Sequence, residues 1–174
     1  MRKITNYRIL ILISTLLILP VIIPSCESLK EDPAYVATWE YKDKLYAGEL
    51  TYNTTRTLAL TKTTYEEVYV IQRDNSSTVV TILGLKGDMT VNGNKMTFNL
   101  KELGACIKDA QDKCTSGVRW YGPGTQYYTD NIQYFRQTIV AEFEADEDYL
   151  WLVRDTNGDG DTEDTGEDIE FERI

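Results

Sequence analysis

Polar and apolar residues alternate along most of the chain from Tyr35 to its last residue, and this period of two constrains the fold more than any other feature. No segment shows a long apolar stripe with the period of 3.6 that marks a helix. Eight to ten short strands at such spacing are typical of an antiparallel all-β barrel or sandwich. The expected strands cover residues 57–61, 65–73, 78–85, 89–91, 96–100, 139–143, 149–154 and 169–174.

Three stretches interrupt this pattern. Asn92-Gly93-Asn94 lies between two alternating runs and predicts a tight hairpin, because Asn and Gly accept positive φ angles. We expect a short helix or a loop at Lys101–Cys114. The stretch Gly117–Gln137 contains the turn signal Gly122-Pro123-Gly124 and is expected to be a long insertion.

The first 25 residues are typical of an export signal. Arg2, Lys3 and Arg8 form a positive start, and no acidic residue precedes Cys26. The apolar run that follows, Ile9–Ile23, is shorter than the roughly 20 residues that span a bilayer as a helix. We therefore predict a signal peptide at residues 1–25 that is removed. The alternative is a short anchor that stays uncleaved.

Ile23-Pro24-Ser25-Cys26 resembles the lipobox of bacterial lipoproteins. The resemblance implies that Cys26 becomes the first residue and carries acyl chains such as palmitate. Residues 26–34 would then be a short tether, and the protein would be held on a membrane of the bacterial cell envelope, periplasmic or surface-exposed. The alternative is an ordinary signal peptide in which Cys26 plays no role.

Lipidation of Cys26 would leave two further cysteines, Cys106 and Cys114. Exported compartments permit disulfides, so we expect these two to form one. The alternative is a pair of reduced thiols that are merely near in sequence. Two cysteines in a chain without histidine are too few ligands for a structural zinc.

Three short motifs resemble the lipocalin family. Ala37-Thr38-Trp39 is similar to its opening motif, Gly87–Leu100 to its middle hairpin, and Phe171–Ile174 to its closing strand. The resemblance implies one lipocalin-like, calycin-type barrel over residues 35–174. It also implies that Arg173 packs on Trp39 and closes the barrel, as a cation–π pair.

The segment from Asp155 to Asp161 carries acidic or amide side chains at alternate positions, and Gly160 occupies its sixth position. This spacing matches the first half of a calcium-binding loop, in which a glycine allows the sharp bend. Its flanks are expected strands, so calcium would bind in a turn between two strands. The alternative is a solvated acidic loop. The candidate ligands are Asp155, Asn157, Asp159, Asp161, Glu163, Asp164 and Glu167.

The chain has a formal charge of −10, and its distribution is uneven. Without residues 1–25 it has 15 basic and 28 acidic residues, and 14 of the acidic residues lie in 142–174 with only two basic ones. An acidic chain is not expected to bind nucleic acid. The absence of histidine excludes catalytic triads with a histidine base, and no catalytic constellation stands out, so we do not expect an enzyme.

Aromatic residues are concentrated in the predicted insertion. Trp120, Tyr121, Tyr127 and Tyr128 could form a ligand-binding rim at the barrel mouth. The alternative is a loop that plugs one end of the barrel.

These features lead to one expected function and one alternative. The expected protein is a membrane-anchored lipoprotein whose barrel binds a small apolar or sugar ligand, or a protein partner in the envelope. The alternative is a structural or adhesive envelope protein with a filled barrel and a calcium-stabilised hairpin. The volume left inside the barrel distinguishes the two.

Overall fold

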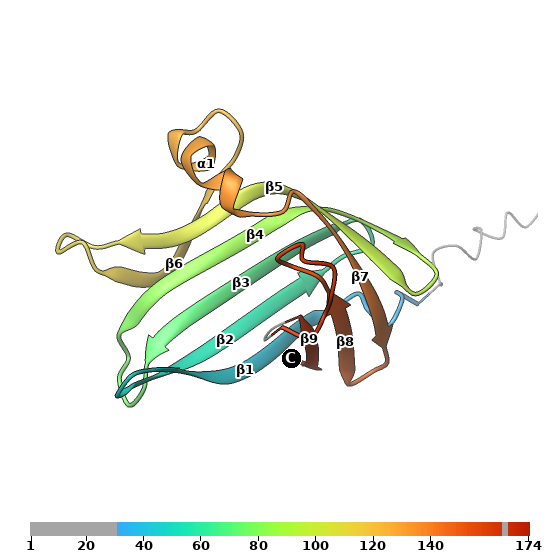
Figure 1. The fold of residues 1–174 in the computed structure, drawn as a ribbon, viewed down its shortest axis with the longest axis horizontal. Helices are drawn as coiled ribbons and strands as arrows, with labels where there is room; N and C mark the ends of the chain where they lie inside the picture. Colours follow the sequence, from blue (N-terminus) through green and yellow to red (C-terminus); the bar gives the residue numbers. More distant parts are fainter. Residues whose placement is uncertain (1–30, 165–166) are drawn as a thin grey trace, which may run out of the picture. The chain divides into compact units, whose positions relative to one another are not determined.

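The computed structural model describes residues 31–164 and 167–174 of the chain (Figure 1). The elements it describes all belong to one compact unit, Asp32–Ile174. The predicted signal peptide, Cys26 and the first residues of the tether lie outside the described residues. Within the described part of the chain, no helix is long and apolar enough to cross a membrane.

The described residues form an antiparallel β-structure with one short helix. The elements in chain order are β1 (Thr38–Ala47), β2 (Leu50–Leu60), β3 (Thr64–Arg73), β4 (Val79–Asn92), β5 (Lys95–Lys108), β6 (Cys114–Tyr121), α1 (Gln126–Asn131), the 3₁₀ turn η2 (Ile132–Tyr134), β7 (Thr138–Ala145), β8 (Tyr149–Arg154) and β9 (Asp168–Arg173).

Eight of the strands close into a barrel, as the sequence pattern predicts. Neighbouring strands pair in the order β4-β3-β2-β1-β9-β8-β7-β5, and β5 also pairs with β4, which completes the ring. The first and last strands meet where Trp39 lies opposite Arg173. Closure leaves no unpaired edge along most of the wall, which removes a site of aggregation.

The long strand β5 changes partner halfway along its length. Residues 95–99 pair with β7, and the second half, from Leu103 to Lys108, pairs with β6 instead. The expectation of a helix or loop at Lys101–Cys114 is therefore wrong for most of that stretch. Small residues such as Gly104 weaken the alternation, but pairing with β4 and β6 on both sides keeps the segment extended.

The predicted insertion at Gly117–Gln137 is also partly strand, because β6 extends to Tyr121. The short helix follows, and the hydroxyl of Thr125 caps its first turn by accepting a hydrogen bond from the backbone N–H of Tyr128. The helix leads through η2 back to β7 (Figure 1).

An apolar core fills one half of the barrel interior. It gathers inward-facing residues from all eight strands of the barrel, and Trp39, Leu58, Met96, Leu150 and Phe171 have no exposed surface. The guanidinium carbon of Arg173 lies 5.6 Å from the ring centroid of Trp39, which is the contact expected from the family resemblance. Arg173 also donates a hydrogen bond to the carbonyl of Glu147, so it ties the β7–β8 turn to the barrel closure.

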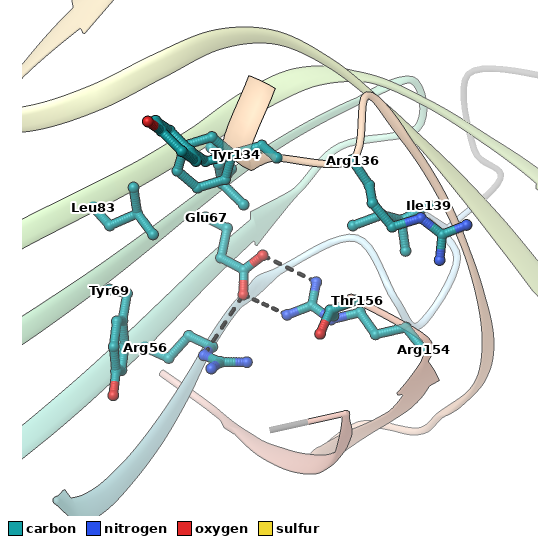
Figure 2. A pocket seen from close by; sticks show the side chains of 11 residues that line it. Arg56, Glu67, Tyr69, Leu83, Tyr134, Arg136, Ile139, Arg154 and Thr156 are labelled. Atoms are coloured by element: carbon teal, nitrogen blue, oxygen red, sulfur yellow. Dashed lines mark hydrogen bonds and ion pairs between the residues drawn. The ribbon is translucent and has the colours of Figure 1, made fainter. Parts of the chain in front are cut away.

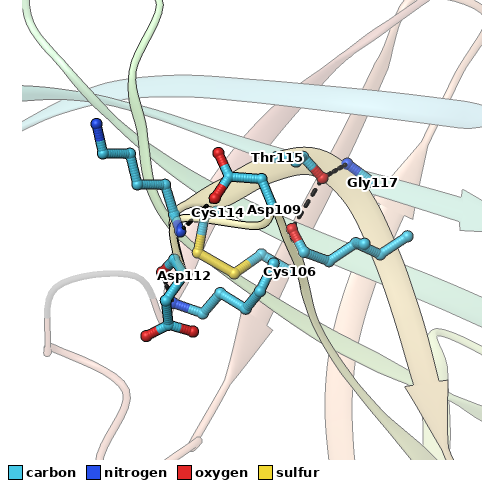
Figure 3. Close-up of a disulfide and its surroundings, with 9 residues drawn as sticks. Cys106, Asp109, Asp112, Cys114, Thr115 and Gly117 are labelled. Atoms are coloured by element: carbon cyan, nitrogen blue, oxygen red, sulfur yellow. Dashed lines mark hydrogen bonds between the residues drawn. A yellow bond between two sulfur atoms is a disulfide. The ribbon is translucent and has the colours of Figure 1, made fainter.

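The disulfide predicted between Cys106 and Cys114 is present. It joins the end of β5 to the start of β6 across the turn at 109–113, with the two Cα atoms 5.4 Å apart (Figure 3). The carboxylate of Asp109 accepts hydrogen bonds from the backbone N–H groups of Gln111 and Lys113, which shapes the same turn. The disulfide therefore fastens the free tip of the β5–β6 hairpin.

Candidate functional site

The inward-facing rows of several strands change from apolar to charged along the barrel. On β2, the buried Leu58 is followed on the same face by Arg56, and on β8 the buried Leu152 is followed by Arg154. Glu67 on β3 lies opposite Leu58 in the strand register, so its side chain also points into the barrel. The strand register therefore gathers two arginines and one glutamate beside the apolar core.

A pocket of about 210 Å³ lies at this charged end of the interior (Figure 2). Ligand sites for drug-sized molecules are commonly about 300–1,000 Å³, so this pocket suits a smaller molecule. Strands β2, β3, β4, β7 and β8 form its walls, and the segment after η2 covers it. The lining residues are Arg56, Glu67, Tyr69, Leu83, Leu85, Tyr134, Phe135, Arg136, Ile139, Arg154 and Thr156.

Glu67 and Arg154 form a bidentate ion pair in the wall of the pocket. Nη2 of Arg154 donates to Oε1 of Glu67 at 2.6 Å, and Nη1 donates to Oε2 at 3.0 Å. Both residues are nearly inaccessible, with 5% and 6% of their surfaces exposed. The Nε atom of Arg56 lies 3.7 Å from Oε1 of the same glutamate, so Figure 2 shows two guanidinium groups reaching one carboxylate.

The surroundings keep these groups charged. Burial raises the pKa of Glu67, but the charge and hydrogen bonds of Arg154, together with the charge of Arg56, outweigh it and hold the pKa below its ordinary value. Burial lowers the pKa of Arg154, and the attraction of Glu67 more than offsets this. For Arg56, burial and the nearby Arg154 lower the pKa, while Glu67 opposes that shift. Glu67 is therefore an ionised carboxylate at neutral pH.

Such a pair is weak evidence for a purely structural role. Two buried charges cost free energy to remove from water, and well-packed apolar residues of similar size stabilise a protein as well or better. The other half of the same barrel is packed with apolar residues. A charged wall beside a pocket is therefore a candidate binding surface.

The β8–β9 loop supplies one side of the pocket through two contacts. Nη1 of Arg136 donates to the carbonyl of Asp155 at 2.8 Å and lies 3.1 Å from its carboxylate. Thr156 donates from its backbone N–H and from its hydroxyl to Oε1 of Glu167, at 2.6 and 2.8 Å. Both pocket residues, Arg136 and Thr156, are thus held by acidic residues of the loop.

The loop that was predicted to bind calcium joins β8 to β9, as expected, but its acidic groups mostly bind the loop itself. Asp155 accepts hydrogen bonds from the backbone N–H groups of Gly158 and Gly160, and Asn157 donates to both Asp159 and Asp164. Asp161 accepts from the backbone N–H of Glu163.

Over residues 31–164 and 167–174, no three acidic side chains are gathered closely enough to hold a metal. One buried oxygen of Glu167, Oε2, has no hydrogen-bond partner among the described residues, and the charge of Glu167 helps to raise the pKa of Arg154. Calcium binding stays a prediction.

The four aromatic residues predicted as a ligand rim lie on β6 and on α1. Trp120 is paired with Gly104, and its ring lies on the outer face of the wall, against Gly84. Tyr121 stacks on Tyr127 with ring centroids 4.4 Å apart. None of these three, nor Tyr128, lines the pocket; the aromatic residues that do are Tyr69, Tyr134 and Phe135. A ligand rim at the four predicted positions stays a prediction.

The charged residues of the pocket were missed by the sequence reasoning, although a signal was present. Glu67 interrupts an otherwise aromatic and apolar row of β3 between Tyr65 and Tyr69. Arg154 likewise ends the apolar row of β8. A charged residue at an inward-facing strand position indicates either the end of the buried part of the strand or a buried ion pair. The residue that completes such a pair is known only when the pairing of distant strands is known.

Comparisons of the chain with known proteins find no relative whose function could be compared with this site. No protein-family model matches the chain. A search of curated proteins also finds no match.

Proposed function

We propose that this protein is a lipid-anchored lipoprotein of the bacterial cell envelope whose barrel binds a small ligand. The observation that carries the ligand-binding part is the pocket beside the buried Glu67–Arg154 pair. Apolar side chains and a few charged groups converge on it, as is usual for small-molecule sites.

Binding fits this pocket better than catalysis. Its one carboxylate, on Glu67, is engaged by two hydrogen bonds from Arg154, and its pKa is lowered. A general acid or base at neutral pH needs a pKa near that pH and a proton that can be transferred. Glu67 has neither property, which supports a protein that binds its ligand unchanged.

The filled half of the barrel favours the alternative of a structural or adhesive envelope protein. Its core residues leave no room for a ligand around Trp39 and Phe171, which have no exposed surface. The two proposals differ in the other half of the barrel, where the pocket lies. A test of binding must therefore act on the pocket and leave the core alone.

Filling the pocket tests the proposal. Leu83 lines the pocket, and Val80 on the same strand is 47% exposed. We expect Leu83→Trp in the full chain to abolish the thermal stabilisation that small amphipathic compounds produce, and Val80→Trp to leave it unchanged. If the folded Leu83→Trp variant binds as well as the original chain, the pocket is not the binding site.

The anchoring part rests on the lipobox-like sequence around Cys26. We expect Cys26→Ser to prevent labelling of the protein with radioactive palmitate and to release it from the membrane fraction. Cys106→Ser is the matched control, because it removes a cysteine of the disulfide and should leave the label in place. Unchanged membrane association of Cys26→Ser would contradict the proposal.

A further inference from the structure

We propose that the outer face of β7, β8 and β9 docks a basic segment of a partner polypeptide, with an arginine or lysine side chain over the ring of Trp151. This face lies outside the barrel wall and shares no lining residue with the interior pocket. Its exposed aromatic rings, its carboxylates and the spacing of its strands each favour such a partner.

Two large aromatic side chains are exposed next to each other on this face. Tyr149 and Trp151 of β8 both point outward, with 46% and 36% of their surfaces exposed, whereas Leu150 between them is fully buried. The indole N–H of Trp151 donates to the carboxylate of Asp168 at 2.6 Å, which fixes the ring on the sheet. An exposed aromatic ring that is held in place is typical of the anchor residues of protein interfaces.

The two rings border an open depression of about 330 Å³. Its lining, among the described residues, contains three carboxylates and no basic side chain. Glu144 and Glu170 lie directly opposite Trp151 on the strands to either side, β7 and β9, and Asp146 lies in the β7–β8 turn. Because neighbouring strands are about 4.8 Å apart, a cation over the Trp151 ring would lie near both glutamates. The ring itself attracts a cation to its face.

Most of the negative charge of this face is not neutralised by neighbours. Lys95 of β5 pairs with Glu142 at one edge of the face. Within residues 31–164 and 167–174, however, no ion pair engages Glu144, Glu170 or Glu172. All three glutamates are exposed. The centre of the face therefore carries an uncompensated negative charge, which complements a basic partner.

These charges bring no benefit to the sheet itself. Glu172 lies directly opposite Glu40 of β1, and like charges that face each other across two strands are destabilising. Lys42 offsets part of this repulsion by pairing with Glu40. Arg173, the neighbour of Glu172 in sequence, points to the other face and packs on Trp39. A role in binding explains an arrangement that costs stability.

A basic polypeptide fits these groups better than a metal ion does. No three acidic side chains in the described part of the chain lie close enough together to hold a metal, because the strands spread the carboxylates apart. Arginine and lysine side chains carry only donors, and carboxylates carry only acceptors. Alternate residues of an extended segment are about 6.6–6.8 Å apart, which is also the spacing of Tyr149 and Trp151 along β8.

Calorimetry with a defined peptide tests the charge complementarity. The probe is an acetylated and amidated nonapeptide in which arginine alternates with serine, and the control probe has uncharged citrulline in place of every arginine. We expect the full chain at neutral pH to bind the arginine peptide about tenfold or more tightly, because only arginine forms charge-assisted hydrogen bonds with the carboxylates. Equal binding of the two peptides, or no binding of the arginine peptide at about 1 mM, would overturn the proposal.

Substitutions locate the docking face. We expect Trp151→Leu to weaken binding of the arginine peptide about tenfold, although it keeps every charge, because it removes the ring. Glu144→Gln combined with Glu170→Gln should weaken binding by about tenfold as well. The matched control combines Glu49→Gln with Glu163→Gln, which removes two exposed charges elsewhere, and should bind like the original chain.

Two results would contradict the assignment to this face. Equal losses in the two double variants would show a general attraction to an acidic protein, and unchanged binding by Trp151→Leu would show that the ring is not the anchor. The comparison of the double variants stands even if Trp151→Leu does not fold, because they leave the aromatic rings in place.

Discussion

At the scale of single residues, the buried ion pair sets both the stability and the chemistry of the pocket. Glu67 and Arg154 come from strands that are far apart in sequence, and each is almost completely buried. Breaking such a pair leaves one charge without compensation, whereas replacing both partners removes the cost of burying them. Removing either partner alone should therefore destabilise the protein. Replacing both with apolar residues should not.

This asymmetry predicts the outcome of a double-mutant cycle. Glu67→Leu alone or Arg154→Met alone should lower the free energy of unfolding by about 3–5 kcal/mol, because each leaves the partner buried without its main counter-charge. Glu67→Leu combined with Arg154→Met should cost much less, within about 1 kcal/mol of the original chain. Urea unfolding of the single and double variants measures both values. Additive losses would show that the two side chains do not interact.

The lowered pKa of Glu67 predicts a pH dependence. The unfolded chain takes up a proton near the ordinary value of 4.5, whereas the folded chain does so only at lower pH. The stability that Glu67 contributes is therefore complete above about pH 5 and is lost as the pH falls through 4.5 toward the folded value. Unfolding free energies of the original chain and Glu67→Gln should converge over this range. A constant difference between them would contradict the lowered pKa.

At the scale of elements, the hairpin β5–β6 extends the barrel wall and depends on two glycines. A Cβ atom at Gly84 would lie 2.6 Å from Cη2 of Trp120 and 2.9 Å from the Cα atom of Gly104. The backbones of β4 and β5 and the Trp120 ring therefore approach one another closely only because both residues lack a side chain. This packing, with the Cys106–Cys114 disulfide at the tip, explains why the second half of β5 is a strand.

The close approach predicts the effect of one added methyl group. Gly84→Ala should destabilise the protein by about 1–3 kcal/mol, because the backbone of β5 and the Trp120 ring must both move. Gly122→Ala is the control, since its Cβ would meet only Glu102, at 3.8 Å, an ordinary contact. Thermal unfolding compares the two. A neutral Gly84→Ala variant would show that Trp120 does not hold this position.

The strands of this fold could largely be predicted from the sequence, and the exceptions have physical causes. Alternation identified β3, β8 and β9 because one of their faces is buried in the core. It failed for Lys101–Cys114, where pairing with two neighbours, rather than an apolar face, keeps the chain extended. The pocket could not be predicted, because Arg56, Glu67 and Arg154 meet only when strands that are far apart in the sequence close into the barrel.

At the scale of the whole molecule, the barrel interior has two parts with different roles. One part is a filled apolar core that includes Trp39 and the closing strand β9. The other is a charged pocket whose cover is formed by the connection from α1 to β7 and by the β8–β9 loop. A stable core in the same barrel fixes the strands that position the pocket residues.

The most direct test of this account is a crystal structure of the full chain with a small amphipathic compound that stabilises it against thermal unfolding. The account predicts the compound inside the barrel pocket, with its apolar part against Leu83 and Leu85. A pocket filled by the protein's own side chains, or the compound bound only on the outer surface at saturating concentration, would contradict the account.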